Sequence, residues 1–101
     1  MRIPPVLSSA GLQSSLHTLH GWRLLSGRVK KLRKSYSLGS LRDAMDFVNE
    51  VARLAEEENH HPDIDVRYNR VTLTLWTHAK GGLTELDLHL AQRIDGVVRT
   101  G

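Results

Sequence analysis

The strongest hydrophobic pattern in the chain predicts a long amphipathic helix from about residue 41 to residue 57. Ser40 is placed to cap its first turn, and Asp43 follows three residues later, close to a capping box. Pro62 prevents the helix from continuing further. The apolar residues that recur three and four apart, and that we expect on the buried face, are Leu41, Ala44, Met45, Val48, Val51, Ala52 and Ala55.

Two further helices are predicted near the ends of the chain. Leucines spaced by four and three indicate a short helix over about residues 9–19, and Gly21 is a natural stop beyond it. After the Gly81-Gly82 break, Thr84 can cap a final helix with Asp87 in its third position. The apolar seam of this helix would be Leu86, Leu90, Ile94 and Val97.

The segments between the helices alternate apolar and polar residues, which is typical of strands. Strand-like runs cover residues 22–29 and 32–38, with Gly27 at a turn, and residues 64–68 and 71–78, with Asn69-Arg70 as the turn. The chain is therefore predicted to be α+β, with a four-stranded antiparallel sheet, three helices packed on one face and the order α-β-β-α-β-β-α. The other face would carry Thr72, Thr74, Trp76 and His78, and such an open face makes a homo-oligomer plausible.

Length and composition limit the class of protein. The 101 residues suit one domain, predicted over residues 9–101 after a flexible lead-in at 1–8. The chain has no cysteine, which excludes disulfides and a cysteine nucleophile. The first residues are too short and too proline-rich for a secretory signal, and no apolar run could span a membrane, so we expect a cytoplasmic protein.

A formal net charge of +3 raises the question of nucleic acid. Five basic residues crowd into residues 28–34, but no aromatic platform accompanies them, and a solvated loop is the plainer interpretation. Nucleic-acid binding is therefore not favoured.

Histidines are the candidate chemical groups. His60 and His61 follow the long helix, and His78 is placed at the end of the last strand. If the second hairpin turns near residue 69, these histidines meet at one end of the sheet even if the pairing slips by a residue or two. An imidazole has an ordinary pKa of about 6.5, so such a cluster suits general acid–base catalysis. A chance gathering of histidines at a polar rim is the alternative.

A metal site is the rival interpretation of the same residues. Glu56 and Asp87 could join the histidines as ligands, but adjacent histidines in extended chain point in opposite directions and chelate poorly. Asp87 has a plain role as a capping residue, and Glu56 as a solvated residue in the last helical turn. Trp76 could either pack in an oligomer interface or form a flat wall for a planar ligand.

Three ordered motifs make the chain resemble the pterin-4a-carbinolamine dehydratase family over about residues 20–97. Gly21-Trp22 and Ala44-Met45-x-Phe47-Val48 fit the same family. Many relatives carry a small serine or threonine where this chain has Trp76, and residues 28–32 also depart from the commonest pattern. The motifs are Ala55-Glu56-x-x-Asn59-His60-His61-Pro62-Asp63, Tyr68-Asn69-x-Val71 and Thr77-His78-x-x-Gly81-Gly82-Leu83-Thr84-x-x-Asp87.

The resemblance implies dehydration of 4a-hydroxytetrahydropterin to quinonoid dihydropterin, in the recycling of the pterin used by aromatic amino-acid hydroxylases. The pterin is then the substrate, no cofactor is needed, and homodimers or homotetramers are expected. The essential histidines would be His60, His61 and His78, with His60 and His78 as the acid–base pair and His61 orienting the pterin. Asp87 could hold His78 in one tautomer. The residues expected to bind or support the substrate are Glu56, Trp76, Thr77 and Asp87.

The alternative from the same resemblance is a binding module without catalysis. Some animal members of the family act as dimerisation cofactors for a homeodomain transcription factor. A complete set of three histidines favours catalysis, because a scaffold has no need of them.

Overall fold

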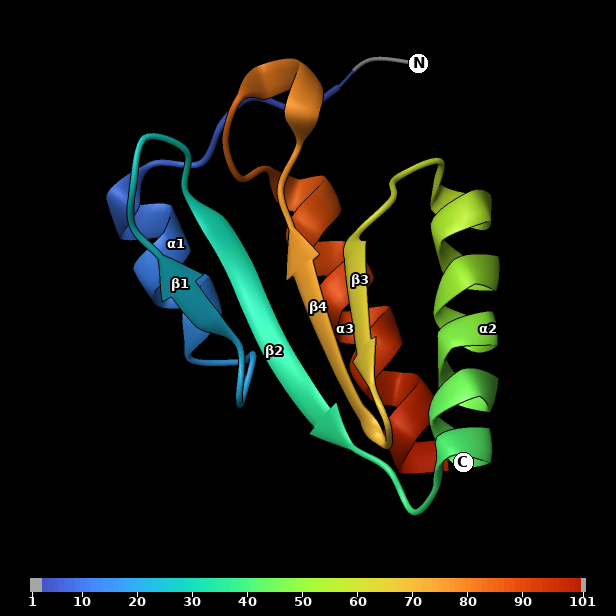
Figure 1. Cartoon of the computed structure of the whole chain (residues 1–101). Coiled ribbons are helices and arrows are strands. Elements are labelled where there is room, and N and C mark those ends of the chain that lie inside the picture. The colour runs from blue at the N-terminus through green and yellow to red at the C-terminus, as the bar shows by residue number, and fades with distance from the viewer. Residues whose placement is uncertain (1–2, 101) are drawn as a thin grey trace.

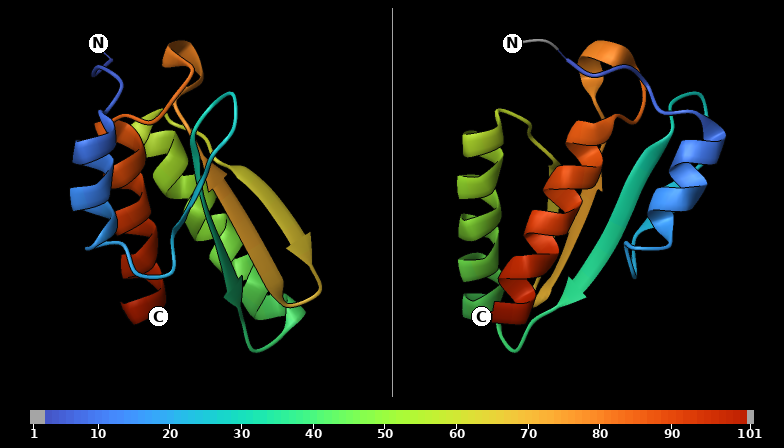
Figure 2. Two further views of the ribbon diagram at one scale, coloured as in Figure 1. Left: turned by 90° about the vertical axis from the view of Figure 1, so that its left-hand side faces the viewer. Right: turned by 180° about the vertical axis from the view of Figure 1, so that it is seen from behind.

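The computed structural model describes residues 3–100, and the predicted α+β fold is confirmed within them. The strand order is β1-β2-β4-β3, and every neighbouring pair is antiparallel. All three α-helices lie on one face of this sheet, and the opposite face is uncovered (Figures 1 and 2). In chain order the elements are α1 (Ser9–Leu16), β1 (Arg23–Leu25), β2 (Lys31–Ser37), α2 (Leu41–Glu58), β3 (Asp63–Arg67), β4 (Arg70–Leu75), the 3₁₀ turn η1 (His78–Lys80) and α3 (Glu85–Thr100).

Helix α2 begins and ends where its sequence predicts. The Ser40 hydroxyl accepts the N–H of Asp43 at 3.0 Å, and Asn59 closes the helix in the left-handed conformation with φ 50°. The predicted buried face is partly wrong, because Leu41, Met45 and Ala52 are exposed. The stripe that faces the core is centred elsewhere on the helix, and its members are Ala44, Phe47, Val51, Leu54 and Ala55.

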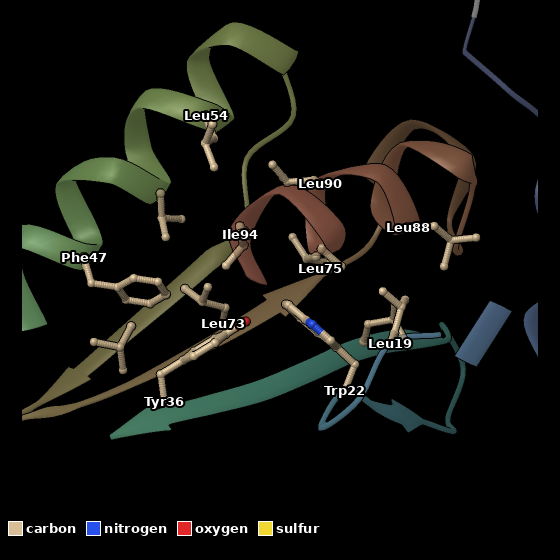
Figure 3. Packing of buried hydrophobic residues seen from close by; sticks show 14 of the residues in the cluster. Leu19, Trp22, Tyr36, Phe47, Leu54, Leu73, Leu75, Leu88, Leu90 and Ile94 are labelled. Carbon is tan, nitrogen blue, oxygen red and sulfur yellow. The ribbon is translucent and has the colours of Figure 1, made fainter. Parts of the chain in front are cut away.

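One hydrophobic core lies between the sheet and the helices (Figure 3). Strand β4 is its centre, since Val71, Leu73 and Leu75 are fully buried, as their alternation predicts. Tyr36 of β2 contacts Trp22 edge-on, with ring centroids 6.4 Å apart, and Phe47 of α2 at 4.8 Å. These contacts hold α2 against the sheet and so place the loop that follows the helix.

Several predicted boundaries are wrong. The first helix ends at Leu16, the first strand keeps only three residues, and β4 ends at Leu75. The turn of the second hairpin is Tyr68-Asn69, because Arg67 pairs with Arg70. The side chain of Asn69 donates a hydrogen bond to the Leu38 carbonyl, and the backbone carbonyl of Asn69 accepts one from the Leu38 N–H. These two bonds tie the turn to the residue that follows β2.

A buried carboxylate joins α3 to the first strands. Asp95 accepts hydrogen bonds from Trp22 Nε1 at 3.1 Å, from Lys34 Nζ at 2.8 Å and from the Tyr36 hydroxyl at 2.7 Å. Burial, and then the neighbouring Asp95 carboxylate, raise the pKa of the Tyr36 hydroxyl well above its ordinary value. Tyr36 therefore stays protonated in the folded protein at pH values where an unfolded tyrosine ionises.

Replacing Tyr36 by phenylalanine is expected to change how stability depends on alkaline pH. The folded-state pKa is raised, so the contribution of Tyr36 is complete below the unfolded value of about 10 and falls away as pH rises above it. Near neutral pH, Tyr36→Phe should lower the free energy of unfolding by about 1.5–3 kcal/mol, because the bond to a carboxylate is lost. Urea unfolding between pH 8 and pH 11 should show a shallower alkaline decline in the variant, and parallel curves would contradict the assignment.

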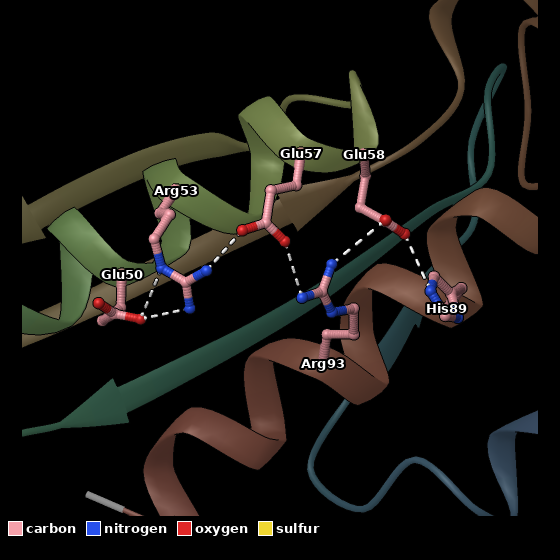
Figure 4. A network of polar contacts seen from close by, with 6 residues as sticks. All are labelled: Glu50, Arg53, Glu57, Glu58, His89 and Arg93. Atoms are coloured by element: carbon pink, nitrogen blue, oxygen red, sulfur yellow. Dashed lines mark hydrogen bonds and ion pairs between the residues drawn. The ribbon is translucent and has the colours of Figure 1, made fainter.

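A seam of charged side chains joins α2 to α3 near the C-terminal end of α2, just before the loop that carries His60 and His61 (Figure 4). Arg93 of α3 donates to Glu57 at 2.9 Å and to Glu58 at 3.2 Å, and Glu58 also contacts His89. The hydrogen bond from Arg93 lowers the pKa of Glu57, and the positive charges of Arg53 and Arg93 lower it further. The seam fixes the last turn of α2 relative to α3.

Candidate active site

The predicted meeting of the histidines is confirmed. Strands β3 and β4 pair Asp63 with Thr74, so the loop before β3 and the loop after β4 lie at the same end of the sheet, the upper end in Figure 1. A hollow of about 480 Å³ opens between these loops. Its walls are Ile3, Glu58, Asn59, His60, His61, Thr77, His78, Ala79 and Leu86.

His60 forms the buried wall of the hollow. The left-handed turn at Asn59 directs the chain back across the helix end, where the His60 N–H donates to the Ala55 carbonyl at 3.0 Å. The His60 ring reaches Asp87 of α3, with Nε2 at 2.6 Å from Oδ1. The expectation that Asp87 would hold His78 is therefore wrong: the packing of α3 beside the end of α2 gives Asp87 to His60.

Asp87 is fully buried, with no exposed surface, and serves two structural ends at once. Its Oδ2 accepts the N–H of Thr84 at 2.9 Å, which confirms the predicted capping role, and the hydroxyl of Thr77 at 2.8 Å. An ionised carboxylate only accepts hydrogen bonds, so the tautomer that suits an ionised Asp87 carries its proton on the Nε2 of His60. When the His60 ring is neutral, its Nδ1 is consequently left as a proton acceptor.

His61 points the other way, as expected for adjacent histidines in extended chain. It is exposed, and its Nε2 lies 2.5 Å from a carboxylate oxygen of Glu56 in the last turn of α2. The pairing restrains the ring at the mouth of the hollow, although both partners remain in contact with solvent. Glu56 therefore acts on the site through its contact with His61.

His78 has neither a carboxylate partner nor a place in a strand. It begins the η1 turn, and no hydrogen bond from either of its ring nitrogens to another residue of the 3–100 range is found. Its ring stacks on Trp76, with centroids 4.0 Å apart and planes inclined by 23°. Trp76 is not among the residues that line the hollow.

Several wall residues were not predicted from the sequence. Ile3 comes from the segment before α1, in which the Leu7 N–H donates to the Leu83 carbonyl at 2.8 Å beside the η1 loop. Asn59 could have been suspected from the motif, but the placement of Ile3 has no local signal. Within residues 3–100, no three side chains of the metal-binding types lie together. No helix in that range is long and apolar enough to cross a membrane.

Comparison with known proteins identifies the family. The sequence model of the family described as "Pterin 4 alpha carbinolamine dehydratase" matches residues 5–97. The chain belongs to this family. A protein of Herpetosiphon aurantiacus, provisionally named as such a dehydratase, is 46% identical over 93 residues, which cover 92% of this chain and 94% of that protein. A relative from Thermomicrobium roseum with the same provisional name is 47% identical over 88 residues, covering 87% of this chain and 91% of the relative.

Two solved structures share the fold of this chain. A Brucella melitensis protein titled transcriptional coactivator/pterin dehydratase superposes with a TM-score of 0.87 at 33% identity, over 91% of this chain and 97% of its own. A pterin dehydratase-like protein described as a RuBisCO assembly factor in the α-carboxysome superposes with a TM-score of 0.67 at 29% identity, over 77% of this chain and 89% of its own. The relatives that carry the dehydratase name are hydro-lyases by that name.

Proposed function

We propose that this chain dehydrates 4a-hydroxytetrahydropterin to quinonoid dihydropterin. The observation that carries the proposal is the gathering of His60, His61 and His78 around one hollow, in a member of the carbinolamine dehydratase family. The hollow of about 480 Å³ lies within the range of small-molecule sites, about 300–1,000 Å³. A bicyclic pterin is a ligand of suitable size.

The reaction is an elimination that exchanges no electrons with a second compound. The bond between C4a and its hydroxyl oxygen breaks, the neighbouring ring nitrogen loses its proton, and a carbon–nitrogen double bond forms between them. The hydroxyl leaves as water after it accepts a proton. The enzyme must therefore supply a proton donor at the hydroxyl on C4a and a proton acceptor at the neighbouring ring nitrogen.

His60 is proposed as the base and His78 as the acid. Asp87 keeps the proton of His60 on Nε2, which leaves Nδ1 to accept the ring-nitrogen proton. His78 is exposed and has both nitrogens available, so it can carry a proton from solvent to the leaving hydroxyl. After each turnover the two rings return to their starting states by exchange with water.

The remaining site residues are proposed to place the substrate and the two histidines. His61, steadied by Glu56, orients the pterin at the open mouth of the hollow. Thr77 lines the hollow, and its hydroxyl is already committed to Asp87, so it contributes shape more than a free donor. Asp87 acts through His60 and does not itself contact the substrate.

The partners of the chain belong to the same proposal. A homodimer or homotetramer is favoured by the uncovered face of the sheet and by β3, which is an edge strand of the sheet. A link to an aromatic amino-acid hydroxylase, which would produce the hydroxylated pterin, and a location in the cytoplasm follow from the same function. Light scattering during gel filtration would measure the oligomeric state.

A binding module without catalysis is the second candidate, favoured by the assembly factor among its structural neighbours. The buried His60–Asp87 pair argues against it. A buried carboxylate–imidazole pair is a feature of acid–base sites, and a buried pair makes no contact with a docked partner. A scaffold would also leave the rate of pterin dehydration unchanged.

A direct assay separates the two candidates. 4a-Hydroxytetrahydropterin is generated in solution, and its decay to quinonoid dihydropterin is followed by absorbance with and without the purified chain. We expect a rate that rises in proportion to the amount of protein and saturates with substrate. A decay rate equal to that of buffer, at protein concentrations where the chain is folded, would contradict the proposed function.

A further inference from the structure

We infer that Trp76 is a positioning residue that holds the imidazole of His78 in its reactive orientation, an inference that rests on the proposed function. The other two histidines each have a carboxylate partner, Asp87 for His60 and Glu56 for His61. His78 has an aromatic ring instead. The stack therefore takes the place that a carboxylate takes elsewhere in this site.

His78 needs such a restraint because of where it lies. It is exposed and stands at the start of a three-residue 3₁₀ turn. An exposed side chain without a hydrogen bond samples several rotamers, and freezing them in the transition state lowers the rate. A face-on contact at 4.0 Å removes much of this freedom before the substrate arrives.

The indole is itself fixed from the neighbouring strand. Strands β2 and β4 pair Leu32 with Leu75, so Lys31 at the start of β2 stands beside Trp76 just beyond the end of β4. Lys31 Nζ lies 4.0 Å from the centre of the Trp76 ring, within the range of a cation–π contact. Lys31 therefore contacts Trp76, and Trp76 in turn contacts His78. We name this group of three residues the Lys31–Trp76–His78 stack.

A direct contact between Trp76 and the pterin is the competing role. Trp76 is not among the residues that line the hollow, whereas His78 is, so we place its effect on His78, and the two roles differ in a measurable way. A residue that only binds the substrate changes KM, whereas one that orients the acid changes kcat.

The test compares Trp76→Thr, which abolishes the stack, with Trp76→Phe, which keeps an aromatic face. From the usual strength of an aromatic pair, Trp76→Thr should lower kcat by about 2- to 10-fold and leave KM nearly unchanged. Trp76→Phe should recover most of the loss. Lys31→Met should give a smaller loss. Its matched control is Lys80→Met, which removes a charge from the η1 turn and leaves Lys31, the cation over the indole, in place.

A measurement without substrate tests the stack by itself. Proton NMR of the free protein should show the ring protons of His78, assigned by their absence in His78→Gln, shifted upfield by the indole ring current. The shift should vanish in Trp76→Thr and persist in part in Trp76→Phe. An unchanged spectrum in Trp76→Thr would overturn the stack.

Activity and NMR together distinguish the two proposals. A lost upfield shift with an unchanged kcat, or a raised KM alone, would overturn the positioning role while leaving the dehydratase function intact. A wild-type chain that shows the upfield shift but does not accelerate pterin dehydration would overturn the proposed function, and with it the catalytic reason for the stack.

Discussion

Replacing His60 or His78 by glutamine is expected to lower kcat for pterin dehydration by about 10²- to 10⁴-fold, the usual contribution of one general acid or base. Glutamine keeps a polar amide of similar length but cannot exchange protons near neutral pH. At position 60 its amide N–H can still donate to Asp87, so the buried carboxylate keeps a partner. The loss should therefore appear in the chemical step and not in the folding of the domain.

Two comparisons make this result specific. His17→Gln, at the exposed end of α1 and away from the hollow, should leave both kcat and the melting temperature unchanged. His61→Gln should raise KM more than it lowers kcat, because this ring is proposed to orient the substrate. Full turnover in both His60→Gln and His78→Gln, with circular dichroism unchanged, would be incompatible with histidine acid–base catalysis.

Replacing Asp87 is expected to separate its structural role from its catalytic one. Asp87→Ala removes the partner of His60, of the Thr77 hydroxyl and of the Thr84 N–H from a fully buried position. Breaking a buried charged network in this way typically lowers the free energy of unfolding by about 3–5 kcal/mol. Urea unfolding would measure the change, and the variant should also lose activity.

Asp87→Asn keeps the size of the side chain and is the sharper experiment. An amide N–H facing His60 would donate to Nε2 and move the imidazole proton to Nδ1, which removes the proposed base. We expect kcat to fall by about 10²- to 10⁴-fold, while the stability loss stays below that of Asp87→Ala. Asp43→Asn, at the corresponding third position of α2, is the matched control and should leave kcat unaffected. An Asp87→Asn variant that retains wild-type kcat would rule out control of the His60 tautomer.

The features of this protein that could be predicted from its residues alone are those that depend on near neighbours in the chain. Hydrophobic spacing and the Ser40 and Thr84 caps predicted both long helices, because helix contacts link residues three and four apart. The meeting of His60 and His61 with His78 was also predictable. It requires only that β3 and β4 form a hairpin, and a turn misplaced by one residue did not separate the loops.

The pairing of the polar groups could not be predicted in this way, because it depends on contacts between elements that are distant in the chain. Asp87 lies nearer to His78 than to His60 in the chain, yet it bonds to His60, 27 residues away, because α3 packs beside the end of α2. The buried Asp95 cluster links residues up to 73 apart, and the buried face of α2 turned away from Leu41 and Met45. Such contacts depend on how whole helices and strands pack together, and on the need of each buried polar group for a hydrogen-bond partner. No local pattern of residue types contains that information.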